Sequence, residues 1–230
     1  MTNKHVIDDS IVGTIKIPIM EPYKGKNFYE ITIDNFEEEF IFHHDDDVDL
    51  CIIPIAPFVN VETLLRENVT FDISGLHDGM LPSDEDIQGY GAIEQIIMIG
   101  YPDGLMDEFN MKPIVRSGIT ATSLRDNYED RREFLIDIAC FGGSSGSPIF
   151  IYKEGAFLGK SGAVQIGTYL AFVGILYAGF DTGIEGEIKE VFVKRKKVSE
   201  IFIPLNIGVA IKSDLMLDFH SLIDDYLSSK

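Results

Sequence analysis

A turn rich in glycine and serine that leads directly into an apolar strand is the segment that most constrains this chain. Residues 142–150 have the sequence GGSSGSPIF, in which Gly143 and Gly146 lie on either side of Ser145. Glycine adopts backbone angles that a side chain would forbid, so such a turn can aim several N–H groups at one point. A serine hydroxyl attacks an acyl group only with a neighbouring base and with N–H donors for the oxyanion. The segment therefore indicates a nucleophile turn, and a tight loop between two strands is the alternative.

A nucleophilic serine needs a base and a carboxylate that orients the base, and the chain has candidates for both upstream. His5 lies in the segment TNKHVI, and Asp49 directly precedes the apolar run LCIIPI. The order is histidine, aspartate, serine, with 44 residues from His5 to Asp49 and 96 from Asp49 to Ser145. The alternatives are Asp47 as the acid and, for His5, an ordinary surface histidine.

In three segments the chain resembles the bacterial trypsin-like serine peptidases that are related to the high-temperature-requirement proteases. The segment around His5 resembles the TNKHV motif at that family's catalytic histidine, and Asp49 begins a stretch similar to its DLAVL strand. Residues 143–148 resemble its GNSGGP nucleophile turn. Chymotrypsin-type enzymes separate the three groups by about 45 and 93 residues, close to the spacing here. Other stretches that resemble strands of the family's second barrel lie at 99–102, 116–120 and 174–179.

The resemblance implies roles for particular residues. His5 would take the proton of the Ser145 hydroxyl and later give it to the leaving amine, while Asp49 would hold the imidazole tautomer. The N–H groups of Gly143 and Ser145 would bind the oxyanion. The base of the pocket for the residue before the scissile bond would be Ala139, which favours a small or apolar residue because it carries no carboxylate. The walls of that pocket would include Tyr177, Ala178 and Gly179.

The resemblance also implies an all-β fold with two β-barrels. The expected division is a remnant of the N-terminal barrel at 1–70, a connection at 71–90, the C-terminal barrel at 91–212 and a C-terminal helix at 213–230. In the family, strands of the first barrel precede the catalytic histidine, whereas four residues precede His5 here. We therefore expect an incomplete first barrel, either because the true start lies upstream or because the chain is a degraded relative.

Local patterns divide the chain into short strands with a few helices. A short helix is predicted at 61–67, and the apolar spacing of the last residues predicts the terminal helix. Runs of β-branched and aromatic residues predict strands at 11–19, 29–33, 39–43, 50–55, 94–99, 113–122, 133–139, 149–152, 168–177, 191–193 and 207–209.

The composition limits the classes of partner. The chain has 230 residues, 45% of them hydrophobic, which suffices for a sizeable core. Its formal net charge of -19 argues against nucleic acid as a partner. The basic cluster at 194–197 is interpreted as a solvated loop or strand edge. No apolar run has membrane-spanning length and no basic start precedes a hydrophobic segment, so we expect no membrane partner and a cytoplasmic protein, unless a signal was lost with a truncated start.

Cysteine and histidine residues give no sign of a metal or cofactor. Cys51 and Cys140 fit buried thiols, and a disulfide between them is the alternative. The run HHDDD at 43–47 is interpreted as a polar loop rather than a metal site, because neighbouring residues of a strand face opposite sides.

The sequence thus predicts a serine endopeptidase that acts on protein or peptide substrates without a cofactor. The alternative is a truncated or inactive trypsin-like relative that serves as a protein-binding module. An esterase of the α/β-hydrolase class is a weaker alternative, because in that class the acid and the histidine follow the serine. The sequence gives no indication of the oligomeric state.

Overall fold

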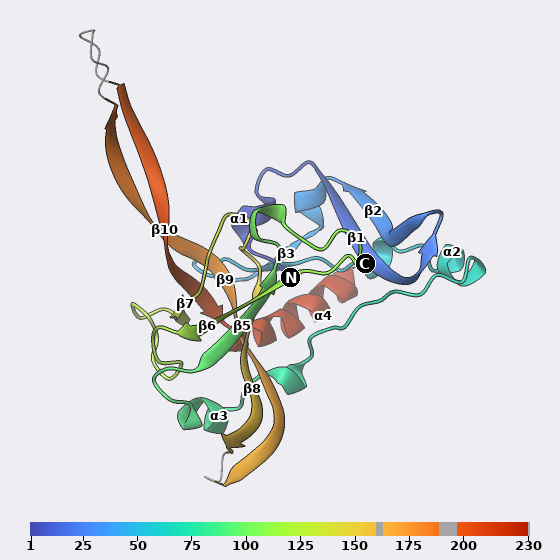
Figure 1. Cartoon of the computed structure of the whole chain (residues 1–230). Coiled ribbons are helices and arrows are strands. Elements are labelled where there is room, and N and C mark those ends of the chain that lie inside the picture. Colours follow the sequence, from blue (N-terminus) through green and yellow to red (C-terminus); the bar gives the residue numbers. More distant parts are fainter. Residues whose placement is uncertain (160–162, 189–196, 230) are drawn as a thin grey trace.

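Strands predominate in the computed structural model, which confirms the prediction of an all-β fold (Figure 1). The structure describes residues 1–159, 163–188 and 197–229, with the backbone alone described at 181–188, 197–204 and 229. Among these residues, no helix is long and apolar enough to cross a membrane. The largest unit is a barrel, and the N-terminal residues build two smaller sheets.

Six of the described strands close into an antiparallel barrel in the order β10, β7, β6, β5, β8 and β9. Their bounds are β5 (Gln95–Gly100), β6 (Ile114–Thr120), β7 (Glu133–Asp137), β8 (Pro148–Leu158), β9 (Val164–Ile188) and β10 (Lys197–Lys212). In β5 the alternate residues Ile96 and Met98 are fully buried, as expected for a strand with one face on a core. Closure pairs each strand on both sides, so the barrel has no free edge around its main core.

The N-terminal residues form two separate two-stranded sheets, and no closed first barrel is seen in the described part of the chain. β1 (Val12–Tyr23) pairs with β2 (Lys26–Asp34), while β3 (Ile41–Phe42) pairs with β4 (Cys51–Ile52). Their buried apolar side chains form small clusters apart from the barrel core, made of Ile17, Ile31 and Ile33 and of Ile7, Phe40 and Cys51. The division of the chain at residues 70, 90 and 212 stays a prediction.

Short helices connect these sheets and end the chain. They are α1 (Lys4–Ile7), α2 (Val61–Arg66), α3 (Asp84–Gly89) and α4 (Phe219–Ser229), with 3₁₀ helices η1 (Phe36–Glu39), η2 (Ala56–Phe58), η3 (Asp78–Met80), η4 (Pro102–Gly104) and η5 (Ser213–Asp218). α2 confirms the helix predicted at 61–67. The predicted C-terminal helix is also present, but its first residues form η5 and the α-helix begins at Phe219. Phe219 is buried in one apolar cluster with Phe172 and Ile211 of the barrel, so α4 is docked on the barrel.

Two hairpins extend well beyond the ranges that the sequence predicts. β8 continues past the predicted 149–152, and β9 and β10 are longer than the predicted 168–177 and 207–209. Their outer parts project from the barrel (Figure 1), and Ile166 there is 88% exposed. A strand that covers no core needs no hydrophobic alternation, so the periodic signal for it is missing. The strand predicted at 191–193 and the basic residues 194–196 lie outside the described residues.

Candidate active site

The structure brings the three residues of the predicted triad together. His5 Nδ1 lies 2.5 Å from Asp49 Oδ2, and His5 Nε2 lies 3.1 Å from Ser145 Oγ. His5 belongs to α1, Asp49 precedes β4, and Ser145 lies in the loop before β8. The His5 side chain is 48% exposed and that of Asp49 22%, so the site opens to solvent while the carboxylate is the better shielded group. The alternative acid, Asp47, is exposed and its N–H donates to Asp45 Oδ1.

A short stretch of pairing with β4 fixes the position of His5. The N–H of Thr2 donates to the carbonyl of Cys51, and the N–H of Cys51 donates to the carbonyl of Thr2, both at 2.9 Å. The next residue, Asn3, is completely buried, and its Nδ2 donates to the carbonyl of Asp49 at 2.8 Å. The N–H of His5 then donates to Asp49 Oδ1 at 3.1 Å. The carboxylate therefore contacts both the backbone and the ring of the histidine, which fixes the ring orientation.

The aspartate is anchored in turn by the residue that follows it. Leu50 is fully buried, and its N–H donates to the carbonyl of Val48 at 2.9 Å. Its side chain belongs to an apolar cluster of the barrel and the C-terminal helix that includes Phe150, Phe172, Ile175 and Phe219. The segment of Asp49 is thus fixed, through Leu50, to the barrel whose strand β8 follows the loop of Ser145.

The glycines of the nucleophile turn adopt the backbone angles that the sequence predicts. Gly143 has φ +71° and Gly146 has φ +82°, both in the left-handed region that favours glycine. A Cβ at Gly146 would lie 2.8 Å from Thr2 Oγ1, so the turn also packs tightly against the segment that delivers His5. The N–H of Gly146 donates to the carbonyl of Leu176 at 2.8 Å, which ties the turn to β9.

The two N–H groups that are predicted to bind the oxyanion, those of Gly143 and Ser145, are not used in the hydrogen bonds of the loop. The N–H of Asp103 donates to the carbonyl of Gly142 at 2.7 Å. In a trans peptide the C=O and the following N–H point in opposite directions, so the N–H of Gly143 faces away from Asp103. Neither this N–H nor that of Ser145 has an acceptor among the residues that the structure describes. Both are available to a developing negative charge.

The residues predicted for the substrate pocket lie around the same loop. Ala139 is half-buried and follows β7, and its carbonyl accepts a hydrogen bond from Arg116 Nη1. The carbonyl of Tyr177 accepts from Ser145 Oγ at 3.3 Å. Burial and the charge of Glu133 raise the pKa of the Tyr177 phenol to about 12. Ala178 and Gly179 pair with Val209 and Gly208 in the ladder of β9 and β10. Their contact with a substrate stays a prediction.

The run HHDDD has one buried member that the sequence did not reveal. One ring nitrogen each of His43 and His44 and one carboxylate oxygen of Asp218 lie within 4.8 Å of one another. His43 Nδ1 accepts from the N–H of Asp45 at 3.1 Å, so in the neutral ring the proton sits on Nε2, which lies 3.2 Å from Asp218 Oδ2. Both ring nitrogens of this histidine are thus used in hydrogen bonds, and the arrangement links the loop to the C-terminal segment. Residues 44–47 are exposed, as expected for a polar loop.

Both cysteines are free and buried, as the sequence predicts. Burial raises the pKa of the Cys51 thiol to about 12 and that of the Cys140 thiol to about 11. Both thiols therefore stay protonated and unreactive near neutral pH.

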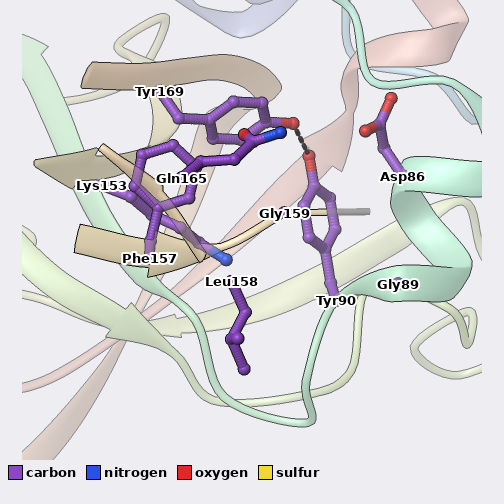
Figure 2. A pocket seen from close by; sticks show the side chains of 9 residues that line it. All are labelled: Asp86, Gly89, Tyr90, Lys153, Phe157, Leu158, Gly159, Gln165 and Tyr169. Atoms are coloured by element: carbon purple, nitrogen blue, oxygen red, sulfur yellow. Dashed lines mark hydrogen bonds between the residues drawn. The ribbon is translucent and has the colours of Figure 1, made fainter. Parts of the chain in front are cut away.

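A second concave region lies between α3 and the hairpin of β8 and β9 (Figure 2). It encloses about 410 Å³ and is lined by Asp86, Gly89, Tyr90, Lys153, Phe157, Leu158, Gly159, Gln165 and Tyr169. The hydroxyls of Tyr90 and Tyr169 lie 2.7 Å apart, and Lys153 Nζ lies 2.9 Å from Glu94 Oε2. The two tyrosines thus bond to each other, Lys153 pairs with a residue outside the lining, and none of the predicted site residues lines the region.

Comparisons with known proteins bear on the same residues. A comparison with curated protein sequences gave no match. A protein-family model, the trypsin-like peptidase domain, matches residues 1–159. The match covers the segment of His5, the entry to β4 and the loop of Ser145, while the closer relation to high-temperature-requirement proteases stays a prediction. Because the matched residues make up more than half of the chain, the protein belongs to the family of trypsin-like peptidase domains.

Proposed function

We propose that this protein is a serine endopeptidase in which Ser145 is the nucleophile, His5 the general base and acid, and Asp49 the group that orients His5. The observation that carries the proposal is the pair of contacts from one imidazole, 2.5 Å to Asp49 Oδ2 and 3.1 Å to Ser145 Oγ. The distance to Ser145 Oγ allows proton transfer through a direct hydrogen bond, and the distance to Asp49 Oδ2 allows a direct hydrogen bond that orients the ring. Membership of the trypsin-like peptidase family supports the same class of reaction.

In the acylation step, Ser145 Oγ attacks the carbonyl carbon of the scissile peptide and its proton moves to His5 Nε2. The carbonyl oxygen becomes an oxyanion, which accepts hydrogen bonds from the N–H groups of Gly143 and Ser145. Asp49 stabilises the imidazolium that forms. The imidazolium then protonates the leaving amine, the C–N bond breaks, and the acyl group remains on the serine as an ester.

In the deacylation step, water takes the position of the departed amine. His5 Nε2 removes a proton from the water as the water attacks the ester carbonyl, and a second oxyanion forms at the same two N–H groups. Collapse of this intermediate breaks the C–O bond to Ser145, and the proton returns from His5 to the serine oxygen. The products are a carboxylic acid and the free enzyme, so the three side chains, the two backbone N–H groups and one water complete the cycle.

We further propose that Ala139, Tyr177, Ala178 and Gly179 form a pocket for a small or apolar residue before the scissile bond. Ala139 provides a methyl group where a carboxylate would be needed to pair with Lys or Arg. A Cβ at Gly179 would lie 3.5 Å from Cys140 Cβ, so the absence of that atom leaves room beside an apolar wall. The measurement is kcat/KM for peptide esters that differ only at this residue. We expect Ala and Val to exceed Lys and Glu by about 10-fold or more; equal values for Lys would contradict the pocket assignment.

The catalytic proposal is tested by covalent labelling with a fluorophosphonate, which reports an activated serine without a known substrate. Wild type is compared with Ser145→Ala and His5→Ala, and with two matched controls: Ser117→Ala, at an exposed serine of β6, and His220→Ala, at an exposed histidine of α4. We expect labelling of wild type and both controls and its loss in the two site variants. A wild-type protein that is folded by circular dichroism and is not labelled would overturn the proposal. So would labelling that persists in Ser145→Ala.

A further inference from the structure

We infer that Arg116 is a positioning residue that holds the oxyanion-binding loop, residues 139–146, in the conformation needed for catalysis. The inference rests on the proposed function and goes beyond it, because Arg116 lies on β6 and is not part of the predicted triad, oxyanion hole or pocket. Its guanidinium contacts the loop at two separated points, and these contacts bracket the residue whose N–H is proposed to bind the oxyanion.

The two contacts of Arg116 reach both sides of that segment. Nη1 donates to the carbonyl of Ala139 at 2.5 Å, and Nη2 donates to Ser144 Oγ at 3.0 Å. Gly143 lies between the two acceptors in the sequence. A single planar guanidinium therefore fixes the distance between the start of the loop and the residue next to the nucleophile.

The acceptor at Ser144 is itself built into the loop. Ser144 is only 1% exposed, and its Oγ also lies 3.4 Å from the N–H of Phe141. The N–H of Ser144 donates to the carbonyl of Phe141 at 3.1 Å, which closes a tight turn over 141–144. The hydrogen bond from Arg116 thus acts on the whole turn and not on one mobile side chain.

A second anchor acts on the other face of the same turn. The N–H of Asp103 donates to the carbonyl of Gly142 at 2.7 Å, so the N–H of Gly143 points away from Asp103. Asp103 has φ +50°, an uncommon backbone angle for a residue with a side chain. With the carbonyl of Gly142 held by Asp103, and with Ala139 and Ser144 held by Arg116, the N–H groups proposed to bind the oxyanion are fixed before a substrate arrives.

The environment of Arg116 favours a functional role over a purely stabilising one. Among the described residues, Arg116 forms no ion pair, although the charge of Asp103 acts on it from a greater distance, and its Nε is buried without a partner. Burial lowers the pKa of Arg116, which indicates that the charge is held in an unfavourable place. A partly buried cation without an ion-pair partner is costly, and replacing it by an apolar side chain of similar length need not unfold a protein. We attribute the presence of Arg116 at this position to its two hydrogen bonds with the loop.

The test compares Arg116→Met and Arg116→Lys with wild type, using kcat and KM for a peptide ester and the rate of fluorophosphonate labelling. Methionine removes both hydrogen bonds, and lysine keeps the charge but cannot bridge two separated acceptors. We expect both variants to lose about 10- to 100-fold in kcat and in labelling rate, with KM changed by less than about 3-fold. The pH at which kcat falls to half on the acid side should stay unchanged, because Arg116 does not contact His5. Full activity of the lysine variant would contradict the clamp.

A matched control separates positioning from general stability. Arg125 also donates from its guanidinium to a backbone carbonyl, that of Tyr90, but it does so away from the site. Arg125→Met should keep wild-type kcat at a similar thermal midpoint to Arg116→Met. If Arg125→Met loses as much kcat as Arg116→Met, the loss reflects stability and the inference is wrong.

A double-mutant cycle tests the contact itself. Ser144→Ala removes the acceptor of Nη2, so Ser144→Ala combined with Arg116→Met should have about the kcat of Arg116→Met alone. Independent, multiplying losses would overturn the assignment.

Failure of the catalytic proposal and failure of this inference are distinguishable. If wild type labels and Arg116→Met labels at the same rate, Arg116 has no positioning role while the peptidase proposal stands. If wild type does not label, the loop is tested by amide hydrogen exchange at Ser144, Gly146 and Ser147, whose N–H groups are hydrogen-bonded within or beside the loop. Faster exchange there in Arg116→Met supports the clamp, and unchanged exchange contradicts it.

Discussion

The N-terminal sheets and the barrel contribute to the same site but are built very differently. The barrel closes on itself, and Phe134, Ile136 and Ile149 in its core are completely buried. Asp49 lies just before β4, which pairs with β3 in a sheet whose strands are two residues long each and share two paired positions. The proposed nucleophile and the proposed oxyanion donors therefore belong to the more strongly supported half, and the proposed base and its orienting acid belong to the weaker one.

This difference indicates where the site fails first. Regions with few buried contacts open at a lower free energy than a closed core, so the segment that delivers His5 should separate from the barrel before the barrel unfolds. Loss of activity and loss of barrel structure should then occur under different conditions. We call the contacts of residues 49 and 50 with His5 and with the barrel the junction. Each of the following changes acts on one side of the junction or on the junction itself.

The largest effect is expected from Asp49→Asn, which leaves the shape of the junction intact but removes its charge. The asparagine oxygen can still accept from the N–H of His5, so its amide N–H would donate to His5 Nδ1. The ring proton would then sit on Nε2, and the wrong tautomer of the imidazole would face Ser145. We expect kcat to fall by about 10⁴-fold, with a thermal midpoint close to that of wild type. The measurement is kcat beside a thermal scan. Asp47→Asn, at the exposed alternative acid, is the matched control and should keep full activity; the reverse result would identify Asp47 as the acid.

The next effect is expected from Leu50→Ala, which weakens the attachment of the N-terminal sheet to the barrel. Truncation of a fully buried leucine costs about 2–5 kcal/mol, and here the cavity would lie beside Phe150 and Phe172. We expect labelling of Ser145 to be lost at a lower urea concentration than the far-UV circular dichroism signal of the barrel. Ile33→Ala, in the small cluster of β1 and β2, is the control for a cavity away from the junction. Coincident loss of both signals in Leu50→Ala would contradict separate opening of the two halves.

A smaller effect is expected from Asn3→Ala, which removes one hydrogen bond from the segment of His5. Nδ2 of Asn3 donates to the carbonyl of Asp49, while its Oδ1 is buried without a partner. The variant loses the bond but also removes an unsatisfied acceptor, so we expect a cost of about 1 kcal/mol or less in unfolding free energy. The His5 ring loses orientation, and we expect kcat to fall by about 3- to 10-fold. Parallel measurements of kcat and urea unfolding check both; unchanged kcat would show that the pairing of Thr2 with Cys51 suffices.

Much of the site could be predicted from the sequence because its chemistry is carried by short motifs. The turn around Ser145 needs two residues with positive φ, and Gly143 and Gly146 are the residue type that supplies them. Asp49 stands at the entry of a buried strand, and its family pattern is equally local. The all-β fold follows from the same kind of signal, since strands with one buried face alternate in polarity.

The supporting contacts could not be predicted, because they join residues that no local pattern relates. Arg116 is 23 residues from Ala139, and Asn3 is 46 residues from Asp49. His43 was expected in a polar loop, yet it is buried because its ring packs against Phe219 and bonds to Asp218, 175 residues away. The projecting parts of the hairpins were missed for the opposite reason, since they contact no core that would impose a period.

The smallest effect is expected from Glu133→Gln, which tests the barrel side without touching the triad. Burial raises the pKa of Glu133 above its usual 4.5, so the folded state holds the proton at a pH where the unfolded chain has released it. Stability therefore falls as pH rises from about the unfolded pKa through the raised folded pKa. Glutamine keeps the shape and has no proton to lose, so its unfolding free energy should lack this fall and should exceed that of wild type at pH 7 by less than about 1 kcal/mol. Urea unfolding at several pH values between 4 and 7 measures the slope. The opposite result would be a free energy of unfolding of wild type that rises through this range more steeply than that of Glu133→Gln. It would mean that the ionised carboxylate, beside Tyr177, stabilises the barrel and that burial is not the main influence on the pKa of Glu133.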